Sequence, residues 1–209
     1  MKYSYYPGCT LKNKAKALDD YARACALTLG FELEELDTWQ CCGGVFVSNN
    51  DEIASKLSSV RALIAAKEAE RPLVTVCSAC HNVIKQTNYQ ITNDETFRNR
   101  ANLYLAQDKE KREPYSGETK VMHYFELLRD VVGFDKIKEK VVNPLTGRKI
   151  AAYYGCLLLR PGKVMAFDDP ENPAIMEEFI RAIGAEPVIY PYRNECCGGY
   201  VAPVSYTHL

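Results

Sequence analysis

The stretch Lys2-Tyr-Ser-Tyr-Tyr-Pro-Gly-Cys9 opens the chain with a short aromatic run, which predicts a β-strand that ends at a Pro-Gly turn. A helix is expected next, because apolar side chains then recur at spacings of three and four before Gly30. Residues 31–36 alternate between apolar and polar and predict a second strand. The expected apolar face of the helix consists of Ala15, Leu18, Ala22, Cys25 and Leu29. We therefore expect Cys25 to pack in the core as a small apolar side chain.

Strands and helices continue to alternate along the chain. Asn50 and Asp51 are good N-cap residues and predict the start of a helix. A β-rich run at residues 72–76 predicts a strand, and a helical pattern follows it. A further helix is expected over residues 123–132. Residues 143–148 have the composition of a loop, so we place a domain boundary there.

The second half of the chain repeats this layout. Strands are expected over residues 149–154 and 186–190. The helix between them is expected to have Asn172 as its N-cap and Gly184 just past its end. The repeat predicts an α/β fold of two related units with largely parallel sheets flanked by helices.

Cysteines mark the same points in both units. Cys9 follows the first strand, the adjacent pair Cys41-Cys42 follows the second, and Cys77-x-x-Cys80 follows the third. In the second unit Cys156 lies 147 residues after Cys9, and Cys196-Cys197 is again an adjacent pair followed by Gly-Gly. We expect a complete first unit over residues 1–145 and an incomplete second unit over residues 146–209. We also expect residues 204–209, which continue no part of the pattern, to be non-native.

The five cysteines of the first unit predict a metal–sulfur site. All five lie in turns at the ends of predicted strands, and in an open α/β sheet those ends meet in one crevice. Thiolate sulfur is the ligand of iron–sulfur clusters, and the helix that begins near Cys77 favours anionic sulfur through its N–H groups. Adjacent cysteines fit poorly on one tetrahedral ion and better on different irons of one cluster. Zinc remains an alternative, because Cys-x-x-Cys alone also suits zinc.

Composition limits the other possibilities. The chain has 47% hydrophobic residues and a formal net charge of −1, so it can build an ordinary core and gives no reason to expect a nucleic-acid partner. No apolar run approaches the roughly 18 residues of a transmembrane helix. The first residues do not form a signal peptide, so a cytoplasmic location is expected, where clustered cysteines bind metal more often than they form disulfides. Cys77-x-x-Cys80-His81 also matches the haem attachment motif, but haem attachment requires export.

The cysteine motifs carry a resemblance to a known family. Tyr6-Pro7-Gly8-Cys9, Cys41-Cys42-Gly43-Gly44 and Cys77-Ser78-Ala79-Cys80-His81-Asn82 resemble the cysteine-rich "CCG" domain, and Glu195-Cys196-Cys197-Gly198-Gly199 repeats part of it. The likeness extends over nearly all the chain to the B subunit of heterodisulfide reductase. These motifs are specific for the domain and much less specific for the substrate.

The resemblance implies an enzyme subunit. In that family each CCG domain holds a noncubane [4Fe-4S] cluster through five cysteines, and two clusters cleave the disulfide between coenzyme M and coenzyme B. The first cluster would then be held by Cys9, Cys41, Cys42, Cys77 and Cys80, and the second in part by Cys156, Cys196 and Cys197. Implied partners are a [4Fe-4S] protein similar to the C subunit of heterodisulfide reductase, a flavoprotein similar to its A subunit, and a small-molecule disulfide.

Other functions and other residues remain open. Related CCG subunits serve lactate, glycolate, glycerol-3-phosphate and succinate or fumarate oxidoreductases, and a zinc-stabilised binding module is the non-enzymatic alternative. His81 is expected near the cluster as a hydrogen-bond donor to sulfur, and His123 as a helix cap or proton donor. Further candidates for a substrate cleft are Tyr5, Tyr6, Tyr153, Tyr154, Arg160 and Arg193, each with packing or solvated surface as the alternative.

Overall fold

The computed structural model describes residues 1–44, 52–108 and 112–199. The first unit contains β1 (Lys2–Tyr6), α1 (Gly8–Lys12), α2 (Lys16–Leu29), β2 (Glu32–Glu35), α3 (Glu52–Glu68), β3 (Leu73–Thr75), α4 (Ser78–Asn93), α5 (Glu95–Leu105), β4 (Val121–His123), α6 (Tyr124–Leu127), the π-helix η1 (Leu128–Val132) and α7 (Phe134–Lys140). The second unit contains β5 (Lys149–Ile150), α8 (Gly162–Met165), α9 (Ile175–Ala182) and β6 (Glu186–Pro187). The predicted α/β fold with parallel sheets is confirmed.

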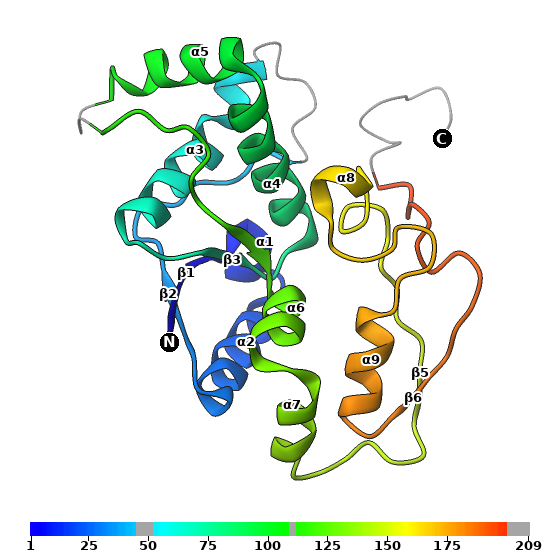
Figure 1. Ribbon diagram of the computed structural model, residues 1–209. Coiled ribbons are helices and arrows are strands. Elements are labelled where there is room, and N and C mark those ends of the chain that lie inside the picture. The colour runs from blue at the N-terminus through cyan, green and yellow to red at the C-terminus, as the bar shows by residue number, and fades with distance from the viewer. Residues whose placement is uncertain (45–51, 109–111, 200–209) are drawn as a thin grey trace.

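A four-stranded parallel sheet in the order β2-β1-β3-β4 is the centre of the first unit. Its strands alternate between two buried cores, as the two-residue period of a strand requires. Tyr5, Val74 and Met122 are in register and belong to the core formed with α2, α6 and α7. Leu73 and Val121, one residue earlier, belong to the core formed with α3, α4 and α5. Figure 1 shows these two groups of helices on opposite sides of the strands.

The helix α2 buries a different face from the one that the sequence predicted. Ala22, Ala26 and Leu29 are buried as apolar residues, whereas Leu18 is 51% exposed and Cys25 is also exposed. The expectation that Cys25 is a core residue is therefore wrong. The buried face includes the carboxylate of Asp19, which accepts a 2.6 Å hydrogen bond from the Tyr5 hydroxyl. Because this member of the face is polar, a count of apolar spacings misplaces the face.

The second unit has the predicted order with shorter elements. Its strands β5 and β6 pair in parallel over two residues each, rather than over the longer runs predicted. The helix α9 begins at Ile175, and Asn172 is not its N-cap. Instead, the Asp168 carboxylate accepts hydrogen bonds from the N–H groups of Ala174 and Ile175 at 2.8 and 2.7 Å. The left-handed Gly184 follows the helix end as expected, and the predicted helix start at residues 50–51 lies outside the described residues.

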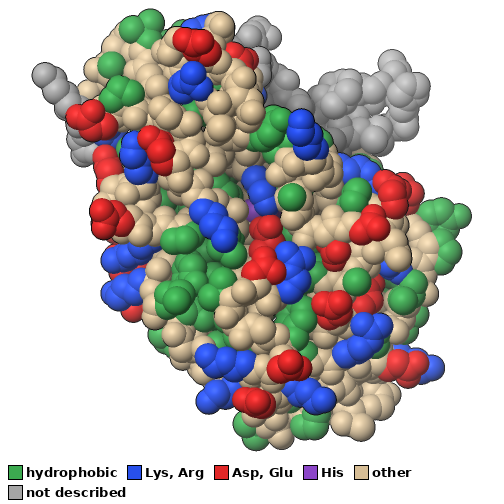
Figure 2. Space-filling model, viewed as in Figure 1, with side chains coloured by type: hydrophobic (Ala, Val, Ile, Leu, Met, Phe, Trp, Pro, Cys, Tyr) green, Lys and Arg blue, Asp and Glu red, His purple; other side chains and the backbone are tan. Residues whose placement is uncertain are grey.

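Aromatic side chains join the two units. Phe179 of α9 packs edge-on against Phe125 and Phe134 of the first unit, with ring centroids 5.3 and 6.3 Å apart. The Arg129 guanidinium also donates a 2.8 Å hydrogen bond to the Phe167 carbonyl. On the molecular surface, acidic and basic side chains lie next to one another, as Figure 2 shows for one side of the molecule.

Replacing Phe179 by alanine should weaken the packing of the second unit on the first. We expect Phe179→Ala to lower the free energy of unfolding by about 2 kcal/mol, because a half-buried aromatic side chain and two ring pairs are lost. Urea denaturation followed by far-ultraviolet circular dichroism measures the change. Leu103→Ala on α5, where the side chain is 67% exposed, is the matched control and should change stability by less than about 0.5 kcal/mol. Equal losses in the two variants would contradict the packing role.

Candidate functional site

Three parallel strands deliver the first cysteine set to one edge of the sheet. Cys9 lies in α1 directly after β1, and Cys77 and Cys80 lie at the start of α4 directly after β3. Cys41 and Cys42 follow β2, which pairs with β1 on its other side. The carboxyl ends of parallel strands lie at one edge of the sheet. The fold therefore brings these cysteines to the same edge, although Cys9 and Cys80 are 71 positions apart in the sequence.

The sulfur atoms contact one another across the strand ends. Cys9 and Cys41 have Sγ atoms 3.7 Å apart, and Cys42 and Cys80 have Sγ atoms 3.6 Å apart. Cys42 and Cys80 are buried, Cys41 and Cys77 are half-buried, and Cys9 is exposed. The set therefore ranges from buried to exposed thiols, and we call the region that these five cysteines border the cysteine crevice.

Gly8 makes room for this arrangement. A Cβ atom at Gly8 would lie 2.6 Å from the Cys80 Sγ atom, closer than real side chains approach. The backbone at Gly8 also has a φ of +76°, which favours glycine. The missing side chain is thus what lets the turn after β1 close onto the α4 cysteine.

The environment divides the thiols into readily ionised and protonated groups. A hydrogen bond from the Cys80 thiol, together with the N–H groups of Ala79 and Cys80, lowers the pKa of Cys77 to about 6. A hydrogen bond from Cys80 and the N–H of Gly44 lower the pKa of Cys42 to about 7. The neighbouring Cys42 and Cys77 thiols, and then burial, raise the pKa of Cys80, and burial raises the pKa of Cys41. Two of the five thiols, Cys42 and Cys77, thus have a lowered pKa, which favours the thiolate form that binds metal.

Tyr6 lies beside the thiols of the first cysteine set. Its ring is fully buried and packs against Trp39 with centroids 5.6 Å apart. The hydroxyl donates to the Gln40 carbonyl, just before the cysteine pair. Burial and then the neighbouring Cys80 raise the Tyr6 pKa, so the phenol stays neutral. Tyr6 is therefore a buried side chain next to the thiols and does not line an open cleft, while Tyr5 faces the opposite core.

Two histidines, His81 and His123, lie close to a charged pair formed by Lys85 and Glu126. His81 is fully buried, and neither of its ring nitrogens has a hydrogen-bond partner among the described residues. Its Nε2 atom is 3.4 Å from the Glu126 carboxylate, a distance within reach of an ion pair but without hydrogen-bond geometry, and its ring lies 5.3 Å from that of His123. Burial lowers the pKa of both histidines, so both are neutral near pH 7. The expected hydrogen bond from His81 to sulfur is not made within this part of the chain.

His123 is a helix cap, as one of the two expectations proposed. Its Nδ1 accepts from the Phe125 N–H at 3.3 Å, and the Glu126 carboxylate accepts from the His123 N–H at 2.6 Å. Lys85 donates to the other oxygen of Glu126 at 3.1 Å. Glu126 and Lys85 were missed from the sequence, although His-x-x-Glu at residues 123–126 has the spacing of a capping box.

The second cysteine set is partly assembled. The thiols of Cys156 and Cys196 share a hydrogen bond, and burial together with this bond raises the pKa of Cys156. Cys196 also accepts a 3.4 Å hydrogen bond from the Gly198 N–H. Cys197 packs near Gly199, where a Cβ atom would lie 3.3 Å from its Sγ atom. Cys196 and Cys197 are exposed, so this set is more open than the first.

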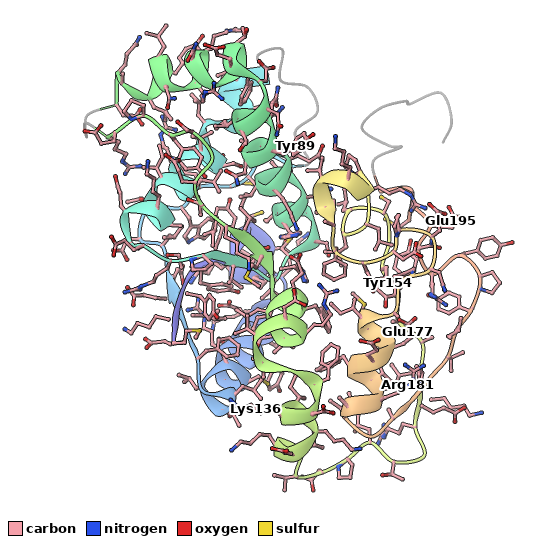
Figure 3. All side chains as sticks on the ribbon, viewed as in Figure 1. Tyr89, Lys136, Tyr154, Glu177, Arg181 and Glu195 are labelled. Carbon is pink, nitrogen blue, oxygen red and sulfur yellow. The ribbon has the colours of Figure 1, made fainter. Side chains whose placement is uncertain are left out.

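A buried charged group supports the second set instead of forming a cleft. Tyr154 donates to the Glu177 carboxylate, whose other oxygen is 3.3 Å from the Arg193 guanidinium (Figure 3 labels Tyr154 and Glu177). All three side chains are buried. The Arg193 carbonyl accepts the N–H of Tyr154 at 2.8 Å, which joins the segments that precede Cys156 and Cys196. Arg193 is therefore not solvated surface, whereas Tyr153 is 48% exposed and binds the Glu195 carbonyl.

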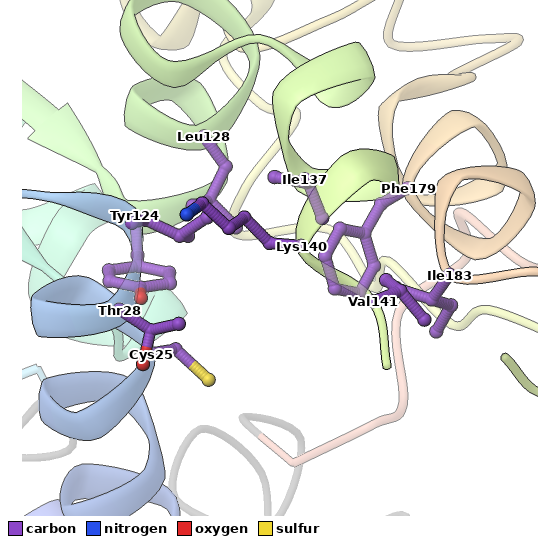
Figure 4. Close-up of a pocket in the computed structure, with 10 residues that line it drawn as sticks. Cys25, Thr28, Tyr124, Leu128, Ile137, Lys140, Val141, Phe179 and Ile183 are labelled. Atoms are coloured by element: carbon purple, nitrogen blue, oxygen red, sulfur yellow. The ribbon is translucent and has the colours of Figure 1, made fainter. Parts of the chain in front are cut away.

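An apolar hollow lies away from the cysteine sets. This cavity of about 250 Å³ lies between α2, α7 and α9, with Tyr124, Leu128 and Phe179 in its wall (Figure 4). None of the eight candidate cysteines lines it, and only Cys25 contributes a thiol. The chemistry of the cysteine crevice, rather than the size of a cavity, identifies the candidate site.

The thiol-rich donor set fits a metal–sulfur group. Within the described ranges, no three side chains of His, Cys, Asp or Glu converge as ligands on a single ion. The sulfurs instead spread along the crevice in two contacting groups, Cys9 with Cys41 and Cys42 with Cys80. The space that Gly8 leaves open borders the Cys80 sulfur.

Comparison with known proteins identifies this arrangement. The family described as the CCG cysteine-rich domain matches residues 3–85 and again residues 150–207, one match for each cysteine set. The 8-methylmenaquinol:fumarate reductase membrane anchor subunit of Wolinella succinogenes is 30% identical over 197 residues, which cover 94% of this chain and 67% of the relative. Among the residues with described structure, no helix has the length and apolar character needed to cross a membrane.

Other relatives are named as subunits of heterodisulfide reductase. The B subunit of the ferredoxin:CoB-CoM heterodisulfide reductase of Methanosarcina mazei is 30% identical over 199 residues, covering 94% of this chain and 65% of the relative. A protein of Archaeoglobus profundus, named as similar to the B subunit of heterodisulfide reductase, is 27% identical over 201 residues, covering 95% of this chain and 66% of the relative. The chain thus spans about two thirds of the length of these relatives. The two family matches and the alignments over nearly all of its length show that this chain belongs to the CCG cysteine-rich domain family, whose members here are subunits of oxidoreductases.

Proposed function

We propose that this chain is an iron–sulfur subunit of a disulfide-reducing oxidoreductase and that its first cysteine set holds a noncubane [4Fe-4S] cluster. The observation that carries the proposal is the convergence of five cysteines from three parallel strand ends on one crevice, without a tetrahedral set for a single ion among the described residues. An adjacent cysteine pair and a fifth thiol suit a cluster better than zinc. Cys9, Cys41, Cys42, Cys77 and Cys80 would be the ligands.

The residues of the chain prepare this crevice for a negatively charged group. When bound, the cluster would supply one-electron transfer at sulfur-ligated iron. The N–H groups at the start of α4 stabilise the Cys77 thiolate, and the N–H of Gly44 stabilises that of Cys42. Neutral Tyr6 lies beside the buried thiols, while Cys9 is exposed to water.

The substrate would be a small-molecule disulfide such as that between coenzyme M and coenzyme B. Cleavage to two thiols requires two electrons and two protons, while an iron–sulfur cluster passes one electron at a time. Cys156, Cys196 and Cys197 would contribute to a second cluster in the whole protein. Electrons would arrive from a [4Fe-4S] partner protein and, before it, from a flavoprotein; the name of one relative includes ferredoxin, which is consistent with such a route.

A second function has specific support. The fumarate reductase subunit of Wolinella succinogenes is as similar to this chain as the heterodisulfide reductase subunit of Methanosarcina mazei is. The chain would then pass electrons between a quinone-linked donor and a fumarate-reducing partner and would cleave no disulfide. The two functions are distinguished by supplying the assembled complex with electrons from a reduced dye and with the disulfide, and then measuring the thiols released. Only the first function produces thiols.

Reconstitution with iron and sulfide under anaerobic conditions tests the metal site. We expect about four irons per chain at the first set and a paramagnetic signal of an iron–sulfur cluster. Cys42→Ala and Cys80→Ala remove the two buried sulfurs and should abolish both. Cys25→Ala is the matched control, because Cys25 belongs to neither set, and it should retain the iron. One tightly bound zinc without iron or sulfide would overturn the proposal.

Gly8→Ala separates the space at the site from the backbone strain at a left-handed glycine. The new Cβ atom would meet the Cys80 Sγ atom at 2.6 Å, so we expect iron binding at the first set to fall several-fold. Gly30→Ala is the control, because Gly30 has a similar φ of +89° but no described atom within 4 Å of a new Cβ. Both variants should lose about 1 kcal/mol of stability through strain. Equal iron contents in the two variants would show that Gly8 does not shape the site.

A further inference from the structure

The two cysteine sets belong to different units, and one side chain connects the two sites directly. Asn82 lies in the first turns of α4, two residues after Cys80, and is 5% exposed. Its Nδ2 atom donates to the Leu157 carbonyl at 2.8 Å and to the Arg160 carbonyl at 2.9 Å. Leu157 is the residue after Cys156. The α4 helix that carries candidate ligands of the first set therefore also holds the turn that carries the first cysteine of the second set.

The direction of these hydrogen bonds is fixed by chemistry. The Leu157 and Arg160 carbonyls and the Met165 sulfur, 3.5 Å away, can only accept, so the nitrogen of the Asn82 amide must face them. The oxygen faces the other way and accepts a 2.6 Å hydrogen bond from Gln86, one turn further along α4. The amide is thus satisfied at both ends and held in one orientation.

Arg160 extends the connection to the adjacent cysteine pair. Its carbonyl accepts from Asn82, and its guanidinium donates a 2.9 Å hydrogen bond to the Asn194 carbonyl. Asn194 lies two residues before Cys196. Hydrogen bonds therefore run from the turn after Cys80, through the turn after Cys156, to the segment before Cys196.

We propose that Asn82 is a positioning residue that sets the second cysteine site against the first. The inference rests on the proposed function in that both sets hold redox groups whose separation matters. The units are also joined by Phe179 and its aromatic partners, at a different place from Asn82. Figure 1 shows α4 beside α8, and α9 beside α7, as two separate regions of contact. Loss of the Asn82 amide should therefore loosen the cysteine-bearing turns without separating the units.

Hydrogen–deuterium exchange with mass spectrometry on the whole reduced, metal-free chain tests this role. Asn82→Asp keeps the size of the side chain but replaces the donor by a group that repels both carbonyls, and Asn82→Leu removes the donor without adding charge. Both should increase exchange at residues 156–160 by about tenfold or more, because two buried hydrogen bonds are lost. Exchange at residues 121–128 and 175–183 should not change.

Asn88→Asp is the matched control. Asn88 lies on the same helix and donates a 2.9 Å hydrogen bond to the Thr119 carbonyl, within the first unit. This variant should change exchange near residues 115–120 and leave residues 156–160 as they are. The conservative variant Asn82→Gln keeps a donor amide and should recover part of the protection that Asn82→Leu loses.

Two outcomes would overturn the proposal. Exchange at residues 156–160 that stays at the parent level in both Asn82→Asp and Asn82→Leu would show that Asn82 does not hold the turn. A uniform rise over the whole chain, with no recovery in Asn82→Gln, would show a general role in folding instead. Iron content and the paramagnetic signal of the reconstituted first set, measured on the same variants, should match the parent. If the parent binds no iron, the proposed function fails while the exchange result still decides the role of Asn82.

Discussion

The convergence of parallel strand ends is the constraint on which the rest of the structure depends. The strands β1, β2 and β3 run in one direction, so the turns that follow them lie at one edge and present their cysteines to one another. The direction is enforced by burial on both faces, since Tyr5 and Val74 fill one core while Leu73 fills the other. A shift of one residue in any strand would exchange these faces and move the cysteines away from the crevice.

Close packing at the crevice then converts proximity into chemistry. Gly8 has no side chain and so lets the Cys80 sulfur approach the turn after β1. Buried Tyr6 packs beside the same turn. The low pKa of Cys77 follows from the Cys80 thiol that donates to it and from its place before the free N–H groups of α4. An anionic metal–sulfur group suits this crevice because its negative charge would meet N–H groups on one side and neutral side chains on the other.

Local patterns predicted the fold and the gathering of the first five cysteines at one edge of the sheet, because strand alternation, turn residues and cysteine spacing are all visible within short windows. They failed where a polar residue takes part in a buried face. Asp19 lies inside α2 because it binds Tyr5, and counting apolar residues alone therefore misplaced Cys25. The cap of α9 failed for a related reason, since Asp168 reaches the helix start from several residues away and no local motif marks it. Contacts between units, such as Asn82 with Leu157, depend on tertiary structure and have no sequence period.

The two units share a design but differ in how they are held. In the first unit a four-stranded sheet with two cores positions the cysteines, whereas β5 and β6 pair over two residues each and contribute little. The buried group of Tyr154, Glu177 and Arg193 compensates. It joins the segments before Cys156 and Cys196 through the hydrogen bond from Tyr154 to Glu177, the ion pair of Glu177 with Arg193 and the backbone hydrogen bond between Tyr154 and Arg193. The second set is also supported by contacts from the first unit. Asn82 provides that support at the cysteine end, and Phe179 provides it at the other contact. The geometry of the second site is thus set in part by contacts between the units and not by the second unit alone.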